Sequence, residues 1–254
     1  MSGRFLRIFF FVAVFVLAAA CGQRSKITDF VKQQDIDAAE YFSDRVTEFS
    51  VKVYYEDAAA PYAGAPLGGS NTWDITFQSF TELFKAHTAR RITVPRELSA
   101  MTPIGRKNVS VWDEKQLTEL AKNLATAEEP GQKVALVIFI HGNYQSEDAV
   151  LGLHFSGLRA AFIFKDNLQK FGGSDQFLRR MEQATVVHEV GHVVGLVNNG
   201  VPMAVPHEDA AHPHHSTDSL DVMYWDIATV VSRTNETNLF GKNSLADGQA
   251  YHLR

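Results

Sequence analysis

The sequence predicts an α/β domain in which helices cover a mixed, twisted sheet. Two observations predict this class. Short apolar or Val- and Tyr-rich segments alternate along the chain with longer amphipathic segments, and no internal repeat or low-complexity tract interrupts them. The 254 residues, 45% hydrophobic and 21% charged, suit one sizeable globular domain. The formal net charge of −5 argues against a nucleic-acid partner.

The first 20 residues have the layout of a secretory signal peptide. Arg4 and Arg7 form a basic start, and residues 8–20 form an apolar run that ends in small side chains. This run is too short to cross a bilayer comfortably. We therefore expect an exported protein whose fold begins after this segment.

The residues Leu-Ala-Ala-Ala-Cys at 17–21 resemble the lipobox of bacterial lipoproteins, and Cys21 is the only cysteine in the chain. The resemblance implies lipidation of Cys21 and a place in the bacterial cell envelope, and Gly22 after the cysteine implies the outer membrane. The alternative is plain cleavage that leaves a secreted protein. With no second cysteine, an intramolecular disulfide is excluded.

Residues 21–45 are polar and mixed, and we interpret them as a tether that leads into a single domain, 46–254. Residues 51–56 are rich in Val and Tyr and predict the first strand. The stretch rich in Ala, Pro and Gly from 58 to 70 predicts a loop.

Two amphipathic segments predict helices that back the sheet. Residues 73–87 place aromatic and leucine side chains at helical spacing, with Asn71 or Thr72 as the cap. Residues 112–124 repeat the pattern with one tryptophan and three leucines.

The remaining strands are expected at 91–94, 134–140, 151–155 and 160–164. The run at 134–140 is apolar throughout, which is typical of a strand buried on both faces. A helix from about 177 to 195 follows these strands. It is apolar on several sides, so it is predicted to be buried.

That buried helix carries His-Glu-Val-Gly-His at 188–192. On a helix His188 and His192 share a face and can bind one metal ion, while Glu189 can act as the general base of a hydrolase. The motif therefore predicts a site for one catalytic Zn²⁺. Gly195 is where the helix could stop and the chain turn back.

A catalytic zinc ion normally has three protein ligands, so a third must be found. The run HEVGHVVG resembles the metzincin pattern HExxHxxGxxH, but Asn198 stands at the last histidine position, and an amide is a poor zinc ligand. Six of the ten histidines lie within 188–215, which supplies candidates.

His215-Ser216 and, four residues later, Asp221-Val222-Met223 resemble the HCxxxxCxM element of the archaemetzincins. The resemblance implies His215 as the third ligand and Met223 as the Met-turn beneath the metal. Ser216 and Asp221 replace that family's cysteines, which implies loss of its accessory structural metal. Over roughly residues 45–230 the chain is similar to a group of exported bacterial metzincin-like lipoproteins, with specific motifs at 188–195 and 215–223. An α+β metzincin-like fold with a short C-terminal subdomain is therefore expected.

Two other third ligands remain open. His212 lies three residues before His215, and Glu208 would give a gluzincin-like site. The segment 197–213 is loop-like, as an insertion ahead of a displaced ligand should be.

The motifs together imply a lipid-anchored zinc endopeptidase that acts on proteins or peptides. The resemblance gives residues 151–153 the role of the edge strand that binds a substrate backbone, and Tyr224 that of an oxyanion stabiliser. The alternative is a non-catalytic, zinc-containing envelope lipoprotein that binds a protein or peptide. Retention of Glu189 beside both histidines favours the enzyme.

Overall fold

The computed structural model describes residues 38–252 apart from 67–68, 88–89, 146 and 148. The predicted signal peptide, Cys21 and most of the predicted tether lie outside the described residues. Within the described part of the chain, no helix is both long enough and apolar enough to cross a membrane.

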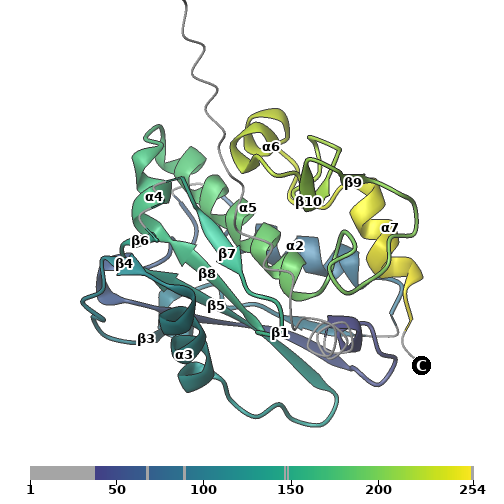
Figure 1. Ribbon diagram of the computed structural model, residues 1–254, viewed down its shortest axis with the longest axis horizontal. Helices are drawn as coiled ribbons and strands as arrows, with labels where there is room; N and C mark the ends of the chain where they lie inside the picture. Colours follow the sequence, from purple (N-terminus) through teal and green to yellow (C-terminus); the bar gives the residue numbers. More distant parts are fainter. Residues whose placement is uncertain (1–37, 67–68, 88–89, 146, 148, 253–254) are drawn as a thin grey trace, which may run out of the picture.

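A six-stranded mixed sheet forms the centre of the molecule, which confirms the predicted α/β class (Figure 1). Its strands are β1 (Glu48–Tyr55), β2 (Arg91–Thr93), β3 (Thr102–Pro103), β5 (Gln132–Ile140), β7 (Gly152–His154) and β8 (Ala160–Phe164). The order across the sheet is β2-β1-β5-β8-β7, and β3 pairs with the carboxyl-terminal end of β1. Only β7 runs antiparallel to its neighbour.

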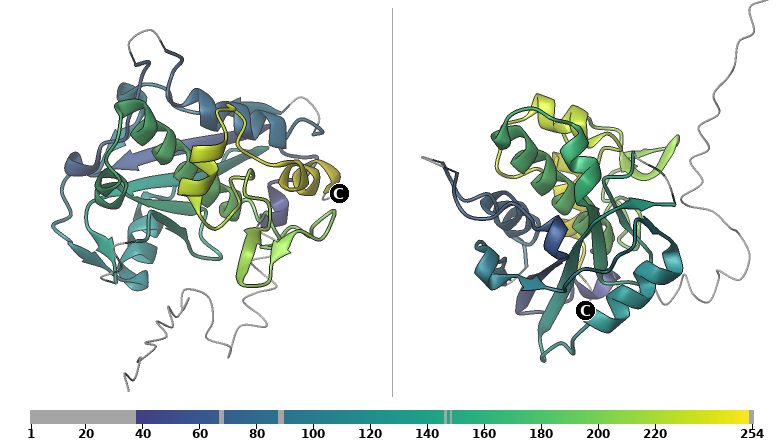
Figure 2. Two further views of the ribbon diagram at one scale, coloured as in Figure 1. Left: turned by 90° about the horizontal axis from the view of Figure 1, so that it is seen from above. Right: turned by 90° about the vertical axis from the view of Figure 1, so that its left-hand side faces the viewer.

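The α-helices that accompany the sheet are α2 (Asp74–Leu83), α3 (Glu114–Leu124), α4 (Lys165–Lys170), α5 (Asp175–Val193), α6 (Ile227–Arg233) and α7 (Lys242–Ala250), with short 3₁₀ turns η1 (Asp57–Ala59) and η2 (Leu98–Ala100). Residues 38–40 are also helical. Two small ladders pair β4 (Val111–Trp112) with β6 (Asn143–Tyr144), and β9 (Glu208–Asp209) with β10 (His212–Ser216). Helices α6 and α7 lie beyond α5, on its side away from the sheet (Figures 1 and 2).

Each face of the sheet has its own core because side chains alternate along a strand. In β5, Val137 and Phe139 belong to the core shared with α2 and α5, whereas Leu136 and Ile138 belong to the core shared with α3. The unbroken apolar run of this strand follows from burial on both faces. The predicted helices at 73–87 and 112–124 therefore cover opposite faces of the sheet.

The predicted start of the second amphipathic helix is two residues early. Trp112 belongs to β4, and its indole N–H donates to the His141 carbonyl oxygen at 2.8 Å. The helix begins after Asp113, whose carboxylate accepts from the Gln116 backbone N–H while the Gln116 side chain accepts from the Asp113 N–H. This reciprocal pair is a capping box and fixes the helix start.

The first amphipathic helix is shorter than predicted, and its cap differs. It ends at Leu83, and Trp73 occupies the N-cap position, where its side chain makes no capping hydrogen bond. Asn71 instead accepts from the Trp73 N–H at 3.0 Å, and the Thr72 hydroxyl donates to the Gly64 carbonyl. Both predicted caps thus order the turn that precedes the helix.

The domain also begins earlier than residue 46. Tyr41 and Phe42, within the predicted tether, are fully buried in the core beneath α2 and α5. The Tyr41 hydroxyl donates to the Val134 carbonyl oxygen at 2.9 Å, which ties this segment to β5. The polar composition of the surrounding residues concealed these two aromatic anchors.

Candidate metal centre

Helix α5 carries the HExxH motif through the middle of the molecule. The Ser174 hydroxyl caps its first turn by accepting from the Phe177 N–H, and the helix ends at Val193. Gly195 follows with φ of 87°, a left-handed conformation that favours glycine, so the chain turns back as predicted. His188, Glu189 and His192 are 4%, 5% and 9% exposed, so polar groups with few protein partners lie inside the fold.

Three imidazoles converge at this point. Donor atoms of His188, His192 and His215 all lie within 4.8 Å of one another. The ring centroids are 4.7 Å apart for His188 and His192, 5.1 Å for His188 and His215, and 5.0 Å for His192 and His215. The structure thus brings together the three predicted ligands, two from α5 and one from β10.

Backbone carbonyls orient two of these rings. The Nδ1–H of His188 donates to the Val222 carbonyl at 2.6 Å, and the Nδ1–H of His215 donates to the Pro213 carbonyl at 2.9 Å. Each bond leaves Nε2 with a free lone pair, as is usual for histidine ligands of zinc. The Nε2 atoms of His188 and His192 are 3.1 Å apart. Tetrahedral zinc with bonds of about 2.0–2.1 Å would hold its ligand nitrogens about 3.3 Å apart, so the group fits zinc.

The electrostatics of the cluster favour neutral, ligand-ready imidazoles. Burial lowers the pKa of His188 to about 3, and burial also lowers the pKa values of His192 and His215. Metal ions bind the deprotonated ring, so these histidines need not release a proton near neutral pH.

The alternative third ligands lie in other contacts. The His212 Nδ1–H donates to an Asp209 carboxylate oxygen at 2.8 Å, and the ring stacks on Trp225 with centroids 4.4 Å apart. Glu208 accepts from the His214 backbone N–H at 2.7 Å and from the Asn198 side chain at 3.3 Å. These bonds brace the segment that carries the third histidine.

Met223 lies against the middle of the HExxH motif. Its side chain is fully buried, and a Cβ added to Gly191 would overlap its sulfur atom. Glycine at this position therefore permits the close approach of the Met223 turn to the helix. The Ser216 N–H donates to the Met223 carbonyl at 2.8 Å, so the same turn is joined to the strand that carries His215.

Ser216 and Asp221 lie in a buried hydrogen-bond network. The Ser216 hydroxyl contacts His207 Nδ1 at 3.2 Å, and His207 Nε2 contacts Asp247 of α7 at 2.8 Å. Asp221 accepts from the Ser244 hydroxyl at 2.6 Å and from the Met223 N–H at 3.0 Å. This network, which the sequence did not reveal, fastens α7 beneath the Met223 turn.

Glu189 lies beside the edge strand β7. A Cβ added to Gly152 would stand 2.7 Å from Glu189 Cγ and 2.9 Å from Thr185 Cγ2, so strand and helix are in close contact there. Burial raises the pKa of Glu189 to about 8. A cation bound by the neighbouring histidines would lower this pKa by favouring the carboxylate.

We expect Gly152→Ala to impair any reaction that depends on the Glu189 carboxylate. The added methyl group must displace that side chain, and a misplacement of about 1 Å typically costs on the order of 10²-fold in rate. The variant should bind zinc like the wild type, because no histidine contacts the added atom within the distances above. Steady-state kinetics tests the first statement and metal analysis the second. An unchanged kcat/KM would contradict the first, and a loss of zinc would contradict the second.

A cavity of about 220 Å³ opens over the histidines and Glu189. Tyr144, Glu147, Leu153 and His154 are among its lining residues. Leu153 belongs to the edge strand that the sequence predicted, whereas no site role was predicted for Tyr144, Glu147 or His154. Tyr224 is not among the residues that line it, so its predicted oxyanion role stays a prediction without a contact in this cavity.

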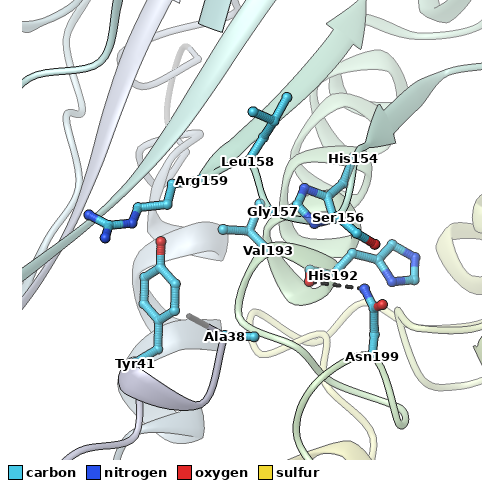
Figure 3. Close-up of a pocket in the computed structure, with 10 residues that line it drawn as sticks. All are labelled: Ala38, Tyr41, His154, Ser156, Gly157, Leu158, Arg159, His192, Val193 and Asn199. Carbon is cyan, nitrogen blue, oxygen red and sulfur yellow. Dashed lines mark hydrogen bonds between the residues drawn. The ribbon is translucent and has the colours of Figure 1, made fainter. Parts of the chain in front are cut away.

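A smaller hollow adjoins His192 on the side of the β7–β8 connection (Figure 3). His154 and Ser156 border it, and the Asn199 side-chain amide donates to the His192 carbonyl at 3.2 Å. The His154 Nδ1–H donates to the Ala160 carbonyl at 3.1 Å. Burial lowers the pKa of His154 to about 4, so a fourth neutral imidazole lies beside the centre.

No protein-family profile and no curated protein sequence matches the chain. Among solved structures, a zinc-dependent peptidase from Methanocorpusculum labreanum (strain Z) is similar at a TM-score of 0.42 and 15% identity, over 78% of this chain and 99% of that one. Both values are low, so the functional assignment rests on the site itself.

Proposed function

We propose that the chain is a zinc-dependent endopeptidase of the metzincin kind, similar to the archaemetzincins, that hydrolyses peptide bonds in proteins or peptides. One observation carries the proposal: three neutral imidazoles from two segments, two of them oriented by backbone carbonyls, converge beside the buried carboxylate of Glu189. A purely structural zinc site has no use for such a base.

Zinc held by His188, His192 and His215 supplies Lewis-acid activation of water and of the scissile carbonyl. Glu189 accepts a proton from the attacking water as the new carbon–oxygen bond forms. It then donates that proton to the amine nitrogen as the carbon–nitrogen bond breaks. The carbonyl oxygens of Val222 and Pro213 keep the His188 and His215 rings in the orientation that metal binding requires.

The peptide substrate is expected to pair with β7. This strand lies at the edge of the sheet. Among the described residues it pairs with β8 on one side and with no strand on the other. An extended peptide added along the other side would pass over Glu189, because Gly152 contacts that residue. The adjoining cavity would receive side chains of the substrate.

Zinc dependence tests the proposed activity. Purified protein should contain zinc, cleave an unfolded protein or a peptide library, lose cleavage in a chelator and regain it when Zn²⁺ is restored. Cleavage that persists in the chelator after the zinc has been removed would contradict the proposal.

Substitution of the third ligand separates His215 from its neighbour. We expect His215→Ala to weaken zinc binding by about 10²-fold or more, since only two protein ligands would remain. His212→Ala is the matched control and should leave zinc affinity within a few-fold, because that ring contacts Asp209 and Trp225 instead. Competition titration against a chromogenic chelator measures both, and full zinc content in His215→Ala would contradict the ligand assignment.

We propose further that the enzyme works at the bacterial cell envelope, held by a lipid on Cys21. The support is the sequence before residue 22 and the single cysteine. Metabolic labelling with a lipid precursor tests this, and Cys21→Ser should abolish the label. A wild-type chain that is never labelled would contradict it.

A further inference from the structure

A second group of metal-binding side chains lies outside the HExxH centre. Asp44 precedes β1, His87 follows α2, and His252 follows α7; one ligand atom from each lies within 4.8 Å of the other two. The views agree that the carboxyl-terminal end of α7 lies beside the segment leading into β1 (Figures 1 and 2). Three segments distant in sequence therefore meet at these side chains.

His87 is prepared to act as a ligand. Its ring is 3% exposed, and its Nε2–H donates to the Gly248 carbonyl oxygen at 2.9 Å. The lone pair therefore resides on Nδ1, which is buried and has no hydrogen-bond partner in the described structure. Buried polar atoms nearly always have a partner, so this nitrogen lacks one that a bound ion would provide. A histidine with one nitrogen on a carbonyl and the other free matches the usual arrangement of a metal ligand.

The other two side chains supply charge and access. His252 Nδ1 lies 3.2 Å from an Asp44 carboxylate oxygen, and the two side chains are 39% and 55% exposed. The ring centroids of His87 and His252 are 4.5 Å apart, slightly closer than the 4.7 Å between those of His188 and His192. Solvent can therefore reach the group and complete the coordination of an ion.

Among the described contacts, the nearby Arg90 makes no direct bond to the Asp44 carboxylate, so it does not compete with an ion for that group. Its guanidinium donates to the backbone carbonyls of Tyr41, Ser43 and Val46, and it lies over the Phe84 ring. Its donors are thus directed at the chain that carries Asp44, which orders this segment next to His87.

We propose that Asp44, His87 and His252 form a second metal site, distinct from the HExxH centre, that binds a transition-metal ion such as Zn²⁺. Two imidazoles and one carboxylate are a donor set that zinc accepts, with water in the remaining position. The ion fastens the segment after α7 to the segment before β1 and to the turn after α2. Its role is structural, because Glu189 and β7 belong to the other centre.

Zinc stoichiometry and thermal unfolding of the full chain test this site. Titration of metal-free protein with Zn²⁺ should give about two ions per chain in the wild type and about one in His252→Ala or Asp44→Asn, two variants at exposed positions. The gain in Tm on adding Zn²⁺ should be smaller in both variants. His141→Ala is the matched control, because His141 forms an exposed pair with Asp166 at 2.7 Å and belongs to neither metal group.

The double variant His188→Ala, His192→Ala separates this site from the proposed catalytic centre. It should lose hydrolysis and still bind about one zinc ion with a rise in Tm. A wild type that binds about one ion, all of it lost in the double variant, would overturn the second site and leave the enzyme proposal intact. Full binding of about two ions by both His252→Ala and Asp44→Asn would overturn it as well.

Discussion

Replacing Glu189 with glutamine is expected to reduce peptide hydrolysis by about 10²–10⁴-fold, the usual contribution of a general base. Glutamine preserves the volume beside Gly152, where the strand and the helix are in close contact. It cannot accept and return the proton. Zinc content should stay near that of the wild type, since the three imidazoles are unchanged.

The measurement is kcat/KM on a cleavable peptide, together with metal analysis of the same preparations. Glu119→Gln is a suitable control because this glutamate is exposed on α3, on the opposite face of the sheet from α5. Zinc-loaded Glu189→Gln with wild-type kcat/KM would rule out this base. That result would favour the alternative function, a non-catalytic zinc-containing protein that binds a protein or peptide.

Replacing Lys165 with methionine is expected to cause the largest loss of stability. Lys165 and Glu182 form an ion pair with side chains 3% and 0% exposed, and the Tyr62 backbone N–H donates to the same carboxylate at 2.7 Å. The ammonium also lies 3.5 Å from the Tyr62 ring centroid. Removing one partner of a buried pair typically costs about 3–5 kcal/mol, because the remaining charge is left uncompensated.

The loss of stability caused by Lys165→Met should grow as the pH rises. Burial raises the pKa of Glu182 to about 7, above its ordinary value of 4.5, and Lys165 opposes that rise. A carboxyl group with a raised folded-state pKa stabilises the fold below about 4.5, and this stabilisation is lost as pH rises through the folded pKa. Without Lys165 the folded pKa of Glu182 rises further, so the variant should lose stability over a wider pH range.

Urea unfolding at pH 5 and pH 8, with a chelator present so that zinc does not contribute, compares the variant with the wild type. The difference in free energy of unfolding should be larger at pH 8. Lys165→Met combined with Glu182→Leu should recover part of the loss, since the unpaired carboxylate is then absent. An equal difference at both pH values would contradict the expected ionisation.

Local patterns predicted most of the sheet and the helix of the site. The apolar runs that became β5 and β8 are buried on both faces, so their composition records the burial directly. The His188 and His192 pair was predictable because helical spacing alone places the two rings together. The start of α3 was less predictable, since Trp112 bonds to the distant His141 carbonyl, while the Asp113–Gln116 capping box is local and marks the start only once Trp112 is placed outside the helix.

The rest depends on contacts between distant residues. His215 was favoured over His212 through a resemblance in spacing, and the structure adds the reason in the separate contacts of His212. Tyr144 of β6 and His154 of β7 line the cavity only because the fold brings these two strands to the same place. The group formed by Asp44, His87 and His252 has no local pattern at all, because three separate segments build it.

The shortness of β7 sets a limit on how a substrate can be held. With three residues, this strand offers a ladder of a few backbone hydrogen bonds, too few to retain an extended peptide tightly. If the chain is the proposed peptidase, its selectivity must come from side chains that fit the adjoining cavity, and a weakly held product would leave readily. The same brevity protects the exposed margin of the sheet from joining another copy edge to edge.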